Sequence, residues 1–151
     1  MKMIDKLYSH AVSLLARKDY TNGEMRRILS QLTEDSIDVE ATLCNLRNEG
    51  YINDQRIAEN MLSRFLRKQY GITRIRLELR QKGIAREITE NLINSLDIDW
   101  FEMASESRIK KFGEDLPIEP KEKAKQIRYL QSRGFSMDVI MESLSPKTDS
   151  Y

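Results

Sequence analysis

The chain has 151 residues, which allows one ordinary domain or a few small modules and excludes two large domains. Prolines and glycines are few, no alternating run of apolar and polar residues predicts a strand, and the single cysteine excludes an internal disulfide. The net charge is only +1, and no apolar run approaches the roughly 20 residues of a membrane span. We therefore expect an all-α, soluble, cytoplasmic protein that has no contact with a membrane.

The first third of the chain carries three helical patterns. Apolar residues recur at helical spacing over residues 4–17 and again over 36–49, where Gly50 is the expected C-cap. Between these two patterns, Thr21 and Glu24 have the spacing of a capping box, in which hydroxyl and carboxylate each accept a hydrogen bond from a backbone amide. The spacing predicts a second helix that begins directly after Thr21.

The middle third predicts three more helices. Asp54 has the position of an N-cap for a helix that reaches Gln69, and Thr73 has the position of an N-cap for a helix that stops at Gly83. Apolar residues at helical spacing over 85–96 complete the set.

The last third repeats the scheme. Asp99 and Glu102 have the capping-box spacing and open a helix that ends before Gly113. Two further helices are expected over residues 121–133 and 136–144. We expect a frayed tail from Pro146 onward.

The nine expected helices group into three sets of three. The corresponding modules are residues 1–52, residues 53–97, which are basic, and residues 98–151 with the tail. The most similar helix-ending segments of two modules are Gln-Lys-Gly-Ile at 81–84 and Ser-Arg-Gly-Phe at 132–135. A repeat of this length indicates an array in which each module packs on its neighbours, and the alternative is one compact bundle with coincidental punctuation.

Catalytic chemistry has no candidate in this sequence. His10 is the only histidine and has no nucleophile or carboxylate cluster at a useful spacing, and Cys44, beside Leu43, is expected to be a small buried side chain. Zinc-ligand spacings, phosphate-binding loops and dinucleotide-binding glycine motifs are all missing from the 151 residues. We therefore expect no enzyme, no cofactor and no metal.

The distribution of charge is uneven along the chain. Residues 54–86 carry nine basic and three acidic side chains, whereas the net charge is −1 over residues 1–53 and −4 over residues 87–151. At about 100° per residue on a helix, Arg67 and Lys68 lie on either side of Arg64 and form a basic stripe. We expect contacts to a partner from eight residues of this block: Arg56, Arg64, Arg67, Lys68, Arg74, Arg76, Arg80 and Lys82.

Three interpretations of this basic block remain open. It could bind phosphates, it could dock on an acidic protein surface, or it could be a solvated helix face. Aromatic residues that would stack on single-stranded bases are sparse, because Phe65 is expected in the core and only Tyr70 is left.

Residues 50–58 read Gly-Tyr-Ile-Asn-Asp-Gln-Arg-Ile-Ala, and residues 74–84 read Arg-Ile-Arg-Leu-Glu-Leu-Arg-Gln-Lys-Gly-Ile. With Tyr70-Gly71 between them, these segments resemble the signature of the RecX family, regulators of the RecA recombinase. Weaker matches extend the resemblance over nearly the whole chain, among them Tyr129-Leu-x-x-Arg-Gly-Phe. One departure is Ile57, where the family usually has phenylalanine, and it keeps an apolar side chain at that position.

The resemblance implies three tandem three-helix repeats in an elongated, curved array that binds RecA filaments on DNA. It implies a non-enzymatic regulator that restrains ATP hydrolysis, strand exchange and co-protease activity of RecA, and so modulates recombination and the SOS response. The array would span neighbouring RecA protomers and occupy space needed by incoming DNA or repressor, and could also cap growing filaments. We expect a monomer that contacts RecA, and DNA within the filament.

Two other classes of function compete with this one. A helical protein that binds nucleic acid without RecA would bind DNA tightly alone and leave RecA ATP hydrolysis unchanged. A structural protein with a solvated basic face would keep its activity when Arg64, Lys68 and Arg76 are changed together to alanine.

Overall fold

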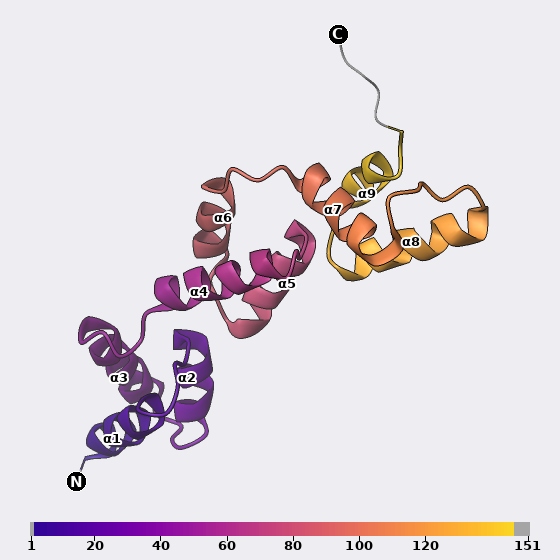
Figure 1. Cartoon of the computed structure of the whole chain (residues 1–151). Coiled ribbons are helices and arrows are strands. Elements are labelled where there is room, and N and C mark those ends of the chain that lie inside the picture. Colours follow the sequence, from indigo (N-terminus) through magenta and orange to yellow (C-terminus); the bar gives the residue numbers. More distant parts are fainter. Residues whose placement is uncertain (1, 147–151) are drawn as a thin grey trace. The chain divides into compact units, whose positions relative to one another are not determined.

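In a computed structural model of the chain, residues 2–146 are described, and they form nine α-helices and no β-strand (Figure 1). The all-α prediction is confirmed, and each helix expected from the sequence lies at its expected place. In chain order they are α1 (Met3–Leu15), α2 (Asn22–Ser30), α3 (Ser36–Asn48), α4 (Asp54–Arg67), α5 (Ile72–Lys82), α6 (Arg86–Asn94), α7 (Trp100–Phe112), α8 (Pro120–Ser132) and α9 (Met137–Ser143).

The chain divides into two compact units. The first consists of Met1–Met61 and Leu79–Glu90, and the second of Leu62–Glu78 and Asn91–Tyr151. The division therefore passes through α4, α5 and α6. Among the helices of residues 2–146, none has the length and apolarity that crossing a membrane requires. The tail expected after Pro146 lies outside the described residues.

The first unit has its core where α1, α2 and α3 meet. Each of these helices contacts the other two, and their inward apolar side chains form one buried cluster with Ile52. Tyr8 and Tyr20 are partly buried against this cluster. The periodic apolar faces predicted from the sequence are therefore the faces that pack. The buried members of the cluster are Leu7, Ala11, Met25, Leu29, Val39, Leu43, Leu46 and Ile52.

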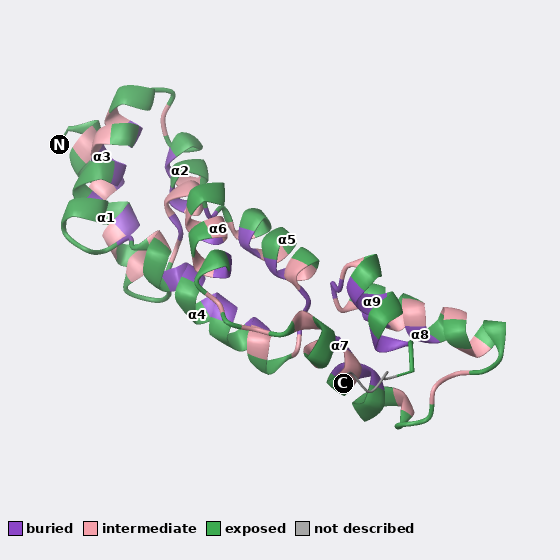
Figure 2. Cartoon of the chain, turned by 90° about the horizontal axis from the view of Figure 1, so that it is seen from above, coloured by how far each residue is buried: buried purple, intermediate pink, exposed green. Residues whose placement is uncertain are grey.

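The second unit has its core between α7, α8 and α9. Leu130 and Ile140 are completely buried there, and Trp100 packs against the cluster from the start of α7. In Figure 2 the helices carry buried and exposed positions along their length, as expected for amphipathic helices.

Side-chain caps mark the starts of α2, α3, α4 and α7. Thr21 Oγ1 accepts from the Glu24 amide at 3.1 Å, and Glu24 Oε1 accepts from the Thr21 amide at 2.9 Å, so the predicted capping box is present. At the start of α7 the Asp99 carboxylate accepts from the Glu102 amide at 3.0 Å, so Asp99 is an N-cap, but the Glu102 side chain does not complete the capping box that the spacing predicts.

Two predicted N-caps are wrong by one or two residues. Asn53 Oδ1 accepts from the Arg56 amide at 3.1 Å, so Asn53 caps α4, and Asp54 is the first helical residue. Its carboxylate is thereby free to accept from the Asn22 amide at 2.8 Å. Gly71 begins α5 through its carbonyl, which leaves Thr73 inside the first turn.

Cys44 also differs from its expectation, because it is exposed. Leu43 and Leu46 turn into the core together with Thr42, which is completely buried. One residue further along the helix from Leu43, Cys44 therefore points outward. Its sulfur lies 3.6 Å from the side-chain nitrogen of Asn48.

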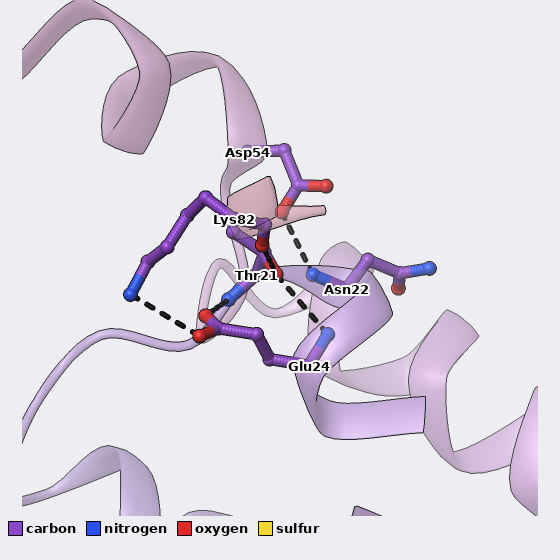
Figure 3. Close-up of polar contacts among 5 residues, drawn as sticks. All are labelled: Thr21, Asn22, Glu24, Asp54 and Lys82. Carbon is purple, nitrogen blue, oxygen red and sulfur yellow. Dashed lines mark hydrogen bonds and ion pairs between the residues drawn. The ribbon is translucent and has the colours of Figure 1, made fainter. Parts of the chain in front are cut away.

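The start of α2 contacts the end of α5 within the first unit (Figure 3). The buried Thr21 hydroxyl donates to the Lys82 carbonyl at 2.8 Å, and Lys82 Nζ lies 3.2 Å from Glu24 Oε2. A Cβ atom at Gly83 would lie 3.1 Å from Thr21 Oγ1, which is tighter than an ordinary contact. Glycine at position 83 allows this approach.

The start of α5 also contacts the end of α8, within the second unit, but through backbone hydrogen bonds. The Gly71 amide donates to the Arg133 carbonyl at 2.8 Å, and the Thr73 amide donates to the Gly134 carbonyl at 3.0 Å. A Cβ atom at Gly71 would lie 2.4 Å from the backbone of Gly134. Gly83 and Gly134 are therefore equivalent, as the similarity of their flanking residues predicts. We call this contact between successive second helices the repeat contact.

Candidate functional site

The eight basic residues predicted to contact a partner do not belong to one compact unit. Arg56, Arg80 and Lys82 lie in the first unit, whereas the other five lie in the second. The two groups are therefore described separately.

In the first unit, two of the three predicted residues have acidic partners. Arg56 Nη2 lies 3.4 Å from Asp19 Oδ1, and both side chains are about half exposed at 51% and 55%. Lys82 pairs with Glu24 next to the capping box. Arg80 is exposed on α5 and forms no ion pair with any residue between 2 and 146. Lys82 thus stabilises the fold, and Arg80 is the free cation of this group.

The pKa values of two carboxylates beside the repeat contact, Glu24 and Asp54, are shifted in opposite directions. Burial opposes ionisation of Glu24, but the Thr21 amide and the Lys82 ammonium outweigh it and lower the pKa of Glu24. Burial raises the pKa of Asp54, and the hydrogen bond from the Asn22 amide only partly opposes this effect. The site thus holds one stabilised and one destabilised carboxylate.

In the second unit, Arg74 has a structural role. Its guanidinium carbon lies 3.9 Å from the centre of the Tyr70 ring, and its Nη1 donates to the Ser132 carbonyl at 3.1 Å. Arg74 Nε also lies 3.5 Å from Glu78 Oε1. Arg74 is therefore a contact between α5 and α8 rather than a free cation. Arg76 is exposed on the same helix.

Tyr70 is not available for base stacking. It is buried, its ring stacks on that of Phe65 with centroids 5.5 Å apart, and the Arg133 guanidinium lies 4.9 Å from its centre. The prediction that Phe65 belongs to the core is confirmed. Tyr70 belongs to the packing around the repeat contact, because Arg74 and Arg133 cover its ring.

Arg64, Arg67 and Lys68 remain exposed at the end of α4. None of them forms an ion pair with a carboxylate in the described part of the chain. Arg67 and Lys68 line a pocket of about 380 Å³ in the second unit, which also touches α7 and α8. We call it the basic pocket, and its lining residues are Arg67, Lys68, Gln69, Ser107, Lys110, Lys111, Tyr129 and Arg133.

Three of the cations in the basic pocket were missed by sequence reasoning. Lys110 and Lys111 lie in the acidic last third of the chain, and Arg133 lies at the end of α8. The adjacent lysines before Gly113 were the only available signal. Arg67 and Lys110 are 43 positions apart, so only tertiary packing brings them together.

Gln69 is the one non-glycine residue between 2 and 146 with a positive φ, at 58°. It follows the last turn of α4, where left-handed backbone favours glycine. Its side-chain nitrogen donates to Glu106 at 3.2 Å, which holds it at the edge of the basic pocket.

No group of three or more His, Cys, Asp or Glu residues that could hold a metal ion occurs among residues 2–146. The single histidine, His10, is exposed on α1. The cations of the basic pocket suit the binding of anionic groups.

Comparison with known proteins gives one consistent result. Models of the second and third three-helix domains of RecX match residues 53–92 and 97–144. The chain is 43% identical to "Regulatory protein RecX" of Acinetobacter baylyi over 92% of this chain and 86% of that one. It is 40% identical to the protein of the same description from Salmonella arizonae, over 91% and 89% of the two chains.

Solved structures agree with these sequence matches. The crystal structure of RecX from Lactobacillus salivarius has a TM-score of 0.75 and 25% identity, covering 94% of both chains. A second crystal structure, described as regulatory protein RecX, has a TM-score of 0.72 and covers 92% of this chain, and at 24% identity it supports the fold alone.

Proposed function

Because the chain belongs to the RecX family of regulatory proteins, we propose that it binds RecA filaments on DNA and inhibits them without catalysis of its own. The inhibited activities are ATP hydrolysis, strand exchange and co-protease activity, and the result is control of recombination and of the SOS response. The observation that carries this proposal is the identity of about two residues in five with regulatory RecX proteins over nine-tenths of the chain.

The proposal treats the chain as three modules, residues 1–52, 53–97 and 98–151, that act as a monomer in the cytoplasm with RecA. The repeat contact supports this division, since the start of one second helix meets the end of the next in both cases, through the Thr21 hydroxyl between α2 and α5 and through backbone hydrogen bonds between α5 and α8. Modules joined in this way form a repeat of their own, which suits a partner filament that is itself a repeat.

Free cations are the contact residues that we propose. Arg64, Arg67, Lys68 and Arg80 are exposed and have no acidic partner within residues 2–146, so an acidic RecA surface or bound DNA would meet them unpaired. Arg56 and Arg76 remain candidate contact residues, and we expect each to contribute less to binding of the partner. Arg74 and Lys82 contribute through the fold, because their charged groups are held by internal contacts.

The decisive experiment measures ATP hydrolysis by RecA on single-stranded DNA while this protein is titrated in. We expect inhibition that saturates at a stoichiometry below one protein per RecA protomer, because one array covers several protomers. Unchanged hydrolysis at a clear molar excess would reject the proposal.

A second candidate is a nucleic-acid-binding protein that acts independently of RecA, and the basic pocket is the observation that favours it. It predicts tight DNA binding at physiological salt and no effect on RecA beyond competition for DNA. Increasing the DNA concentration would then abolish any inhibition, whereas inhibition through direct RecA contacts would persist.

A further inference from the structure

The basic pocket concentrates positive charge from three segments of the second unit. Arg67 and Lys68 come from the end of α4, Lys110 and Lys111 from the last turn of α7, and Arg133 from the residue after α8. All five residues lie in one compact unit, so their grouping follows from its internal packing.

The charges of the pocket are not neutralised from within. No carboxylate of residues 2–146 pairs with any of the five cations. The nearby Glu106 accepts from the Gln69 side chain instead, at 3.2 Å. Arg133 is held in place, because its Nη2 donates to the Lys68 carbonyl and its guanidinium lies over the Tyr70 ring, while its buried Nε has no hydrogen-bond partner in the described chain. Like charges held this close repel one another, so an anionic ligand would stabilise the unit.

We propose that the basic pocket binds phosphate groups along the backbone of a nucleic-acid strand. A phosphate presents acceptor oxygens in several directions, which suits cations that converge from three segments. One isolated phosphate carries a charge of at most about −2, whereas a strand brings one charge for each nucleotide and so matches a five-cation site better. This inference deepens the second candidate function, on which it rests, by naming the residues that bind the strand, and its test without RecA can fail while inhibition of RecA still holds.

The uncharged lining indicates that the pocket reads backbone rather than bases. Tyr129 makes an edge contact with Phe112 at 5.3 Å and has Lys111 Nζ 5.6 Å from its centre, so its ring already has neighbours. Gln69 is held by Glu106. The uncharged lining side chains named here thus offer no open aromatic face and no free amide for base readout, and the charged ones suit phosphate oxygens. Binding is therefore expected to be independent of base sequence.

The test uses the full chain without RecA and measures fluorescence anisotropy of a labelled oligo-dT strand over a series of salt concentrations. Each phosphate contact contributes a slope of about −0.7 to the dependence of log K on log salt for single strands. Lys110→Ala with Lys111→Ala should therefore lower the magnitude of the slope by about 1.4. Equivalently, raising salt from about 50 to 200 mM should weaken the variant roughly sevenfold less than the wild type.

The matched control is Lys121→Ala with Lys123→Ala, which removes the same charge from exposed positions on α8 outside the pocket. We expect the control to keep the wild-type slope, and circular dichroism to show all three proteins folded. Equal changes of slope in the two variants, or no change in either, would reject the pocket as the site.

Two competitors identify the ligand class. A mixed-sequence oligonucleotide should displace the labelled strand as well as oligo-dT does, and both should outcompete inorganic phosphate and polyglutamate at equal ionic strength. Displacement by polyglutamate as effective as by oligonucleotide would assign the pocket to acidic protein segments and overturn the proposal. Equally effective displacement by inorganic phosphate would overturn the assignment to a strand.

Discussion

The Glu24 carboxylate contacts two parts of the first unit. It closes the capping box of α2 and pairs with Lys82 at the end of α5, and these contacts lower its pKa. A carboxyl whose folded-state pKa is lowered stabilises the fold above its unfolded pKa, and this contribution is lost as the pH falls through the folded value. Asp54, whose pKa is raised, has the opposite sign and is destabilising once it ionises.

Two substitutions at this site should therefore act in opposite directions. At pH 7, Glu24→Gln should lower the free energy of unfolding by about 0.5–1 kcal/mol, because the ion pair is lost while the amide oxygen still caps the helix. Asp54→Asn should be neutral or slightly stabilising, since its amide oxygen can still accept from Asn22. Urea unfolding at pH 7 and pH 3 checks both, and the Glu24→Gln deficit should shrink at pH 3. A deficit that persists unchanged at pH 3 would contradict the ionic origin.

Gln69 holds a backbone conformation that glycine adopts more easily. A left-handed backbone costs a residue with a Cβ atom about 1–2 kcal/mol. Glycine avoids this steric cost, but part of the gain is lost because glycine makes the unfolded chain more flexible. Gln69→Gly should therefore raise the free energy of unfolding by about 0.5–1 kcal/mol in urea titrations. Gln69→Ala is the control and should not stabilise, because it removes the Glu106 contact and keeps the strain.

At the scale of helices, the N-caps predicted from the sequence are confirmed where the cap residue and its hydrogen-bond partner are close in sequence. The Thr21–Glu24 box and the Asp99 cap depend on residues three apart, and both were predicted. The prediction of Asp54 as an N-cap was wrong because its carboxylate accepts from Asn22, which is 32 residues away. The prediction of Thr73 was wrong because its amide donates to the distant Gly134 carbonyl. Cap residues that serve a distant element cannot be assigned from local spacing.

The repeat contact gives a sharp prediction for two glycines. Gly71→Ala would place a Cβ atom 2.4 Å from the Gly134 backbone, so the helices must separate at a cost of roughly 2–3 kcal/mol. Gly23→Ala, at the start of α2, meets nothing nearer than 3.5 Å and should be neutral or stabilising by up to about 1 kcal/mol. Thermal unfolding of both variants tests this, and comparable losses would disprove the steric explanation.

At the scale of the whole molecule, the basic middle of the chain was a correct signal of charge but an incomplete description of the site. Composition identified Arg67 and Lys68, yet it also included Arg74 and Lys82, whose charged groups have internal partners. Lys110 and Lys111 were missed because their neighbours in sequence are acidic. Which cations are free depends on tertiary pairing, and that information is not contained in local charge counts.

Inhibition of RecA should depend on free cations outside the basic pocket as well. Arg64→Ala with Arg80→Ala should raise the midpoint of RecA ATPase inhibition about 3–10-fold, or roughly 0.7–1.4 kcal/mol. The Lys121→Ala and Lys123→Ala double variant, which removes the same charge, should leave the midpoint within about twofold of the wild type. Equal shifts in the two variants would show that only total charge matters.

The repeat contact has a consequence for how such chains can change in evolution. Between α5 and α8 it is made largely by backbone atoms of Gly71, Thr73, Arg133 and Gly134, and so it demands glycines rather than a matched pair of side chains. A module with this geometry needs few matched side chains in its partner when it is duplicated or exchanged, Arg74 being one of them. The start of α8, Glu119-Pro120, has neither a glycine nor a hydroxyl that would let another helix end approach it closely. A further module added after α9 could therefore not form the repeat contact with α8.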